Sequence, residues 1–122
     1  MGASSKLESG IVFVSISGDL KPEELLAFCQ ENIDSWVGKP ALWDLEGFNF
    51  SREYLQQAPY LIRETVKIFN RRAGEKSAVL AKSKVLYGTA RMYQQMRDGV
   101  GAVQLRVFDD RERAINWLQA PG

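Results

Sequence analysis

The segment 77–94, SAVLAKSKVLYGTARMYQ, places a short apolar strand directly before an amphipathic helix. Ser77–Ala81 has the length and apolar character of a buried strand, and Ser83 stands where a helix needs an N-cap. In open α/β domains, ligands and partners bind at strand-to-helix junctions of this kind. The segment therefore constrains the fold and also indicates where a site is to be sought.

The same strand-then-helix pattern recurs along the chain. β-Branched and apolar runs predict strands at 11–17, 41–45, 77–81 and 103–108, and each is followed by a helical pattern. A short partner strand before the first run, with Ser9-Gly10 as the turn, is a further expectation. Alternating strands and helices imply parallel crossovers. The sequence thus predicts an α/β fold with a four- to five-stranded, mostly parallel sheet and about four helices.

Single residues mark where the helices begin, break and end. Pro59 is expected to kink the second helix or to split off its first turn, because proline lacks the N–H group. The third helix is expected to run from Ser83 to about Arg97 and to stop at Gly99 or Gly101. Asp109 and Glu112 form a capping-box pattern that predicts the start of the last helix.

The length of 122 residues favours one domain, which we place at residues 7–120 after a polar, disordered tail at residues 1–6. No run approaches the 18 or so apolar residues of a transmembrane helix, so no membrane span is expected. The first ten residues lack the apolar core of a signal peptide. A cytoplasmic location is therefore the expectation.

The chain has no histidine and one cysteine, Cys29, whose helical spacing predicts a small buried side chain. The lack of histidine removes the commonest general base, most zinc sites and every Ser-His or Cys-His nucleophile pair. We therefore expect no catalytic residues, no metal and no cofactor. Carboxylate- or lysine-based chemistry is left open, and Asp44 with Lys82 is the pair that an enzyme of this sequence would use.

Four segments together resemble the SpoIIAA-like family, often labelled STAS/SEC14-domain proteins. They are 14–20 (VSISGDL), 42–45 (LWDL), 78–81 (AVLA) followed by 87–93 (YGTARMY), and 107–118, and they span about residues 10–119. The resemblance implies a mixed sheet and a regulatory domain that docks a protein partner. Some members are switched by phosphorylation of a serine after the second core strand. Ser51 lies near that place, although the Asp-Ser-Ser-Gly turn is missing and an N-cap role is the alternative.

Candidate binding residues gather at the expected carboxyl ends of two strands. They are Asp44, Lys82, Ser83, Tyr87 and Arg91. On a helical wheel, Tyr87 and Arg91 share a solvent-facing side, which is typical of an interface hot spot. The alternative is that Tyr87 only covers a neighbouring element. The opposite, core-facing side is expected to carry Val85, Leu86, Thr89, Ala90, Met92, Tyr93 and Met96.

Two functions follow as expectations. The first is a non-catalytic, STAS-like regulatory domain that binds a protein partner. The alternative is a binding protein for a small apolar or anionic, lipid-like ligand, held in a crevice near Asp44, Lys82 and Tyr87. An acidic N-terminal half and a basic C-terminal half also favour a homodimer, unless they are only two solvated faces. Nucleic acid is not expected, because aromatic residues do not interleave the basic ones.

Overall fold

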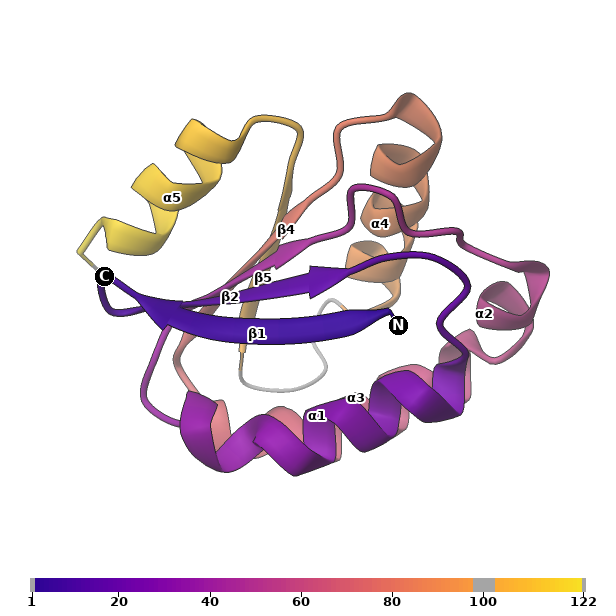
Figure 1. Ribbon diagram of the computed structural model, residues 1–122, viewed down its shortest axis with the longest axis horizontal. Helices are drawn as coiled ribbons and strands as arrows, with labels where there is room; N and C mark the ends of the chain where they lie inside the picture. Colours follow the sequence, from indigo (N-terminus) through magenta and orange to yellow (C-terminus); the bar gives the residue numbers. More distant parts are fainter. Residues whose placement is uncertain (1, 98–102, 122) are drawn as a thin grey trace.

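The computed structural model describes residues 2–97 and 103–121, which form a five-stranded sheet covered by helices (Figure 1). The strands are β1 (Ala3–Glu8), β2 (Ile11–Ile16), β3 (Ala41–Asp44), β4 (Lys76–Leu80) and β5 (Gln104–Phe108). The helices are α1 (Pro22–Trp36), α2 (Arg52–Gln56), α3 (Ala58–Phe69), α4 (Lys84–Arg97) and α5 (Arg111–Gln119), with a 3₁₀ turn η1 (Asn70–Arg72). The predicted α/β class and mixed sheet are confirmed.

β1 and β2 form an antiparallel hairpin, in register from Ala3 opposite Ile16 to Glu8 opposite Ile11. Ser9 (φ 52°) and Gly10 (φ 78°) both have positive φ, as a two-residue type I′ hairpin turn requires. The predicted partner strand is therefore confirmed, and the tail predicted at residues 1–6 is wrong for residues 3–6. Ser4, Ser5 and Lys6 are exposed and Ala3 is half-buried, and the backbone of all four residues pairs with β2.

The strands lie in the sheet in chain order, β1-β2-β3-β4-β5, and β2 to β5 are parallel. Because the order never reverses, successive right-handed crossovers place α1, α3 and α4 on one face of the sheet. α5 comes after the last strand and packs on the opposite face, as Figure 1 shows for α5 relative to α1 and α3. The sheet thus has one face with three helices and another with a single helix.

The predicted break at Pro59 is confirmed, because the helical region divides into α2 and α3 at Gln57. The start of α5 differs by one residue from the prediction. The N-cap is Asp110, whose carboxylate accepts a hydrogen bond from the backbone N–H of Glu112 at 2.9 Å, so Asp109 lies outside the helix. The expected stop of α4 at Gly99 or Gly101 falls outside the described residues.

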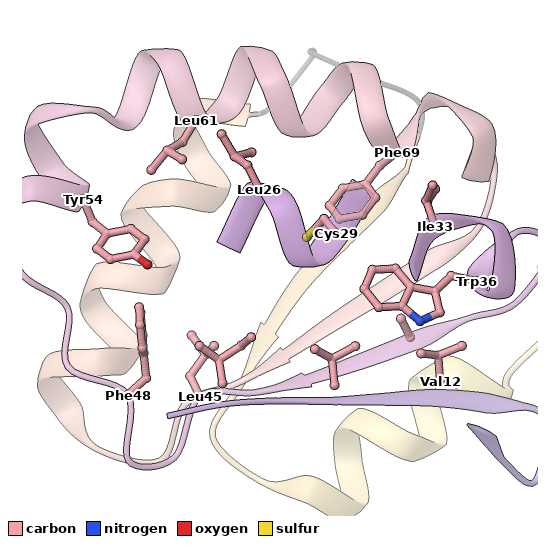
Figure 2. Packing of buried hydrophobic residues seen from close by; sticks show 13 residues of the cluster. Val12, Leu26, Cys29, Ile33, Trp36, Leu45, Phe48, Tyr54, Leu61 and Phe69 are labelled. Carbon is pink, nitrogen blue, oxygen red and sulfur yellow. The ribbon is translucent and has the colours of Figure 1, made fainter. Parts of the chain in front are cut away.

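The largest apolar cluster lies between the sheet and the helices α1 and α3. Figure 2 shows side chains from the strands and from both helices pointing toward one another, among them Val12, Cys29, Trp36 and Phe69. Trp36 is 2% exposed, and its ring centroid lies 5.5 Å from that of Trp43. A smaller cluster under α5 is built on Leu42, Ala78, Leu80, Ala114 and Leu118 with their neighbours.

Two buried cationic side chains, Arg72 and Lys76, donate hydrogen bonds to carbonyl and hydroxyl oxygens near β4. Arg72 donates hydrogen bonds to the Ser77 hydroxyl at 2.8 Å, the Lys39 carbonyl at 2.7 Å and the Lys76 carbonyl at 3.2 Å. The Lys76 ammonium donates to the carbonyls of Trp117 at 2.9 Å and Ala120 at 2.7 Å, at the end of α5. Lys76 therefore fixes the end of α5 to the sheet.

Replacing Lys76 by methionine keeps the aliphatic stem and removes both hydrogen bonds. We expect Lys76→Met to lower the free energy of unfolding by about 1.5–3 kcal/mol, the range for hydrogen bonds made by a charged group. Amide hydrogen exchange should quicken in α5 first. The control is Lys67→Met, because Lys67 is exposed and its ion pair among residues 2–97 and 103–121 is with Glu64 on its own helix. Equal stability of the two variants would contradict the role given to Lys76.

Candidate functional site

An apolar cavity of about 170 Å³ lies between the sheet and the helices α1, α3 and α4. Figure 2 shows Leu45, Tyr54 and Leu61 pointing into this interior from different elements. Apolar and aromatic side chains make up most of its wall. The lining residues are Ile16, Leu25, Cys29, Trp43, Leu45, Phe48, Phe50, Tyr54, Leu61, Ile62, Thr65, Phe69, Ser77, Val79, Ala90, Tyr93, Arg97 and Leu105.

The periodicities of the strands and helices aim these side chains inward. Ser77 and Val79 alternate with Ala78 and Leu80 along β4, so the first pair faces the cavity and the second faces α5. On α4, the lining residues are Ala90, Tyr93 and Arg97, three and four positions apart, as one face of a helix requires. α3 contributes four lining residues in the same way. The cavity is therefore built mainly by regular elements, and Leu45, Phe48 and Phe50 are added from the loop after β3.

Three hydroxyl groups at the cavity donate hydrogen bonds to backbone carbonyls, and that of Ser77 accepts a hydrogen bond from Arg72. Tyr54 donates to the carbonyl of Leu20, and Tyr93 donates to the carbonyl of Tyr54 at 2.5 Å. Thr65 donates to the carbonyl of Leu61 on its own helix at 2.7 Å. The bonds to carbonyls leave the hydroxyl groups of Tyr54, Tyr93 and Thr65 without a free proton to offer a ligand.

Burial also raises the pKa values of the thiol and phenol groups in the cavity wall and so makes them unreactive. It raises the pKa of the Cys29 thiol from 9.0 to about 12 and the pKa of the Tyr93 phenol from 10.0 to about 12. The pKa of Tyr54 is raised as well, mainly by burial and further by the neighbouring Tyr93. All three groups hold their protons at neutral pH, so none of them supplies a nucleophile or a general base.

Arg97 is the single charged side chain among the described residues that line the cavity. Its Nε atom is shielded from solvent and has no hydrogen-bond partner among those residues. Burial lowers the pKa of Arg97. The sequence reading missed this residue, although Arg97 continues the spacing of Leu86, Ala90 and Tyr93 on the inner side of α4.

Asp44 and Lys82, which were predicted at the carboxyl edge of the sheet, each form an ion pair with a residue outside the predicted set. Lys82 lies 3.4 Å from a Glu46 carboxylate oxygen, and Arg111 lies 3.7 Å from a carboxylate oxygen of Asp44. Asp44 also accepts a hydrogen bond from the backbone N–H of Glu46 at 2.9 Å. The charges at this edge are thus paired with opposite charges. A shallow hollow beside them is lined by Lys82, Asp109, Asp110, Arg111 and Arg113, again of mixed sign.

The side of α4 that faces the sheet differs from the predicted side. Tyr87 is half-buried against Ala81, Ala90 and Val107, so the solvent-facing position predicted for it is wrong and its covering role is the one observed. Arg91 is exposed. Conversely, three residues expected in the core are exposed on the outer side, namely Val85 (77%), Met92 (41%) and Met96 (42%). Apolar residues on both sides of the helix made the pattern ambiguous, and packing on β5 decided it.

Two predicted serines lie at helix starts. The hydroxyl of Ser83 accepts a hydrogen bond from the backbone N–H of Leu86 at 3.1 Å, which confirms its capping role at α4. Ser51 occupies the N-cap position of α2, is exposed, and makes no side-chain capping bond. Phosphorylation of Ser51 stays a prediction.

No protein-family model matches this chain, and no curated protein is significantly similar to it. Within residues 2–97 and 103–121, no helix is long and apolar enough to cross a membrane. The same residues hold no cluster of three or more histidine, cysteine or acidic side chains that would bind a metal ion.

Proposed function

We propose that this protein is a non-catalytic binding protein that takes a small apolar ligand into the cavity between the sheet and α1, α3 and α4. The observation that carries the proposal is the cavity itself, about 170 Å³ of apolar-lined space, partly open to the surface, in a 122-residue domain. Protein interiors are packed to crystal-like density and leave few voids of this size. An engineered apolar cavity of about 150 Å³ in another protein stays dry and binds benzene.

The chemistry of the wall favours binding over catalysis. Its thiol and phenol groups are protonated, and the hydroxyl groups of Thr65 and Tyr93 donate to backbone carbonyls. Burying apolar surface is then the main driving force, at roughly 25 cal/mol per Å². The ligand is expected to be the size of one aromatic ring or a short branched chain, because a long acyl chain exceeds the space.

The experiment is a thermal melt of the full chain with and without toluene, an apolar probe of the right size. A ligand that binds only the folded state stabilises it by about 2.7 kcal/mol at a concentration 100 times its Kd. We expect the melting temperature to rise with the toluene concentration and then to saturate as the cavity fills. An unchanged or falling melting temperature at every concentration would rule out the proposal.

The second candidate is a STAS-like regulatory domain that docks a protein partner. It is favoured by the exposed outer side of α4, where Val85, Met92 and Met96 lie four and seven positions apart on one stripe. The five-stranded mixed sheet agrees with the resemblance to the SpoIIAA-like family. In this case Met92→Lys should abolish retention of a specific partner and leave the toluene-induced rise in melting temperature intact.

A further inference from the structure

Arg97 is half-buried, and its hydrogen bonding differs from that of the fully buried Arg72. Arg72 also has an Nε without a partner, but its two terminal nitrogens donate three hydrogen bonds to protein oxygens. Arg97 lines the apolar cavity instead, and its shielded Nε finds no acceptor among the described residues. A shielded N–H donor without an acceptor is costly, so this group is expected to have an acceptor when the cavity is occupied.

The surroundings of Arg97 narrow down what that acceptor is. The described residues of the wall include no carboxylate, and none of their hydroxyl oxygens accepts a hydrogen bond from the Arg97 Nε. A positive group at one point of an otherwise apolar cavity selects a ligand with an apolar body and one anionic end. Carboxylates match the planar N–H fork of arginine, which offers Nε and a terminal nitrogen side by side.

We propose that the ligand of the cavity is a small apolar monocarboxylate, whose carboxylate pairs with the Arg97 guanidinium. This inference rests on the proposed function and adds the chemical class of the ligand. The apolar body, an aryl ring or a short branched chain, lies among the side chains of α3 and the central strands, including Leu61 and Val79. Arg97 thus determines specificity, and the apolar wall supplies most of the affinity.

Two probes that differ only in charge test the inference. Phenylacetate and its neutral isostere phenylacetamide are titrated into the full chain, and binding is followed by backbone amide NMR. Wild-type protein should bind phenylacetate at least about tenfold more tightly, which corresponds to about 1.4 kcal/mol. In Arg97→Gln this preference should disappear, while the Kd for phenylacetamide changes by less than about twofold, since the apolar contacts remain.

Two further variants keep the result interpretable. Arg91→Gln is the matched control, because Arg91 is exposed on the same helix, and it should retain the preference. Arg97→Lys keeps the positive charge but lacks the paired N–H donors of the guanidinium. It should retain a reduced preference for phenylacetate over phenylacetamide. Equal affinity of wild-type protein for the two probes, or an unchanged preference in Arg97→Gln, overturns the inference and leaves the proposed function standing. Failure of both probes and of toluene to bind overturns the proposed function itself.

Discussion

Replacing Thr65 by phenylalanine is expected to abolish binding of toluene and phenylacetate, with a loss of affinity of about 100-fold or more. Thr65 lies in α3 and lines the cavity, and its hydroxyl donates only to carbonyls of its own helix, those of Leu61 and Ile62. Its removal therefore breaks no bond between elements. The added ring occupies the volume that a benzene-sized ligand needs, about 150 Å³ in the known apolar example.

The measurement is the Kd for each probe from NMR titration, together with the melting temperature of the free protein. Filling an existing void avoids the strain of overpacking. The free energy of unfolding of the ligand-free variant should therefore be no more than about 1 kcal/mol below that of wild type. Thr89→Phe is the matched control, because the Thr89 hydroxyl likewise donates to a carbonyl of its own helix, that of Val85. It should bind both probes normally. A folded Thr65→Phe variant with wild-type affinity would show that the probes bind elsewhere.

Trp36→Ala is expected to lower the free energy of unfolding by about 3–5 kcal/mol, the range for truncation of a large buried aromatic side chain. Trp36 is 2% exposed and packs against Phe28, Trp43 and Phe69, with ring centroids 5.7, 5.5 and 6.4 Å away. It joins the end of α1 to β3 and α3. Since small domains are stable by only about 5–15 kcal/mol, this one truncation removes a large share.

Urea denaturation of both proteins measures the difference. The control is Val37→Ala, next in the chain and 37% exposed, where a change within about 0.5 kcal/mol is expected. A loss below about 1 kcal/mol in Trp36→Ala would mean that the cluster around Trp36 is not the main core of the domain.

The elements of the fold were predictable because local signals and tertiary packing agree. The apolar runs that became β3 and β4 are buried on both faces, so they read as continuous apolar segments rather than alternating ones. Pro59 marked the division between α2 and α3 through its missing N–H group. β1 was the harder case, because its exposed polar side chains carry no core pattern and its place depends on backbone pairing alone.

The orientation of α4 was not predictable from its sequence. Its apolar residues surround much of the helix, and only the contact of Ala90 with Ala81 and Val107 fixes which side faces inward. For this reason Tyr87, which was predicted to face solvent, packs on the core, and Met92, which was predicted in the core, is exposed. An amphipathic pattern gives one orientation only when the polar residues are confined to one side.

The cavity was not predicted from the sequence, for a reason that lies in the order of the strands. Crevices at carboxyl edges arise where the strand order reverses and neighbouring crossovers go to opposite faces. Here β2 to β5 follow one another without reversal, and Asp44 and Lys82 end in ion pairs with Arg111 and Glu46. The cavity lies instead under three helices packed on the same face. The size of the cavity depends on the packing positions of these helices relative to the sheet, and no local sequence pattern determines those positions.

Intermolecular NOEs between toluene and the protein test the central claim most directly. We expect cross-peaks from the toluene ring to methyl groups that line the cavity, those of Leu61, Ile62, Val79 and Leu105. The same spectrum contains the methyl groups of Val85, Met92 and Met96 on the outer side of α4, which should show none. Cross-peaks confined to these exposed methyl groups, or none at all at saturating toluene, would contradict the claim that the interior of this domain binds a small apolar ligand.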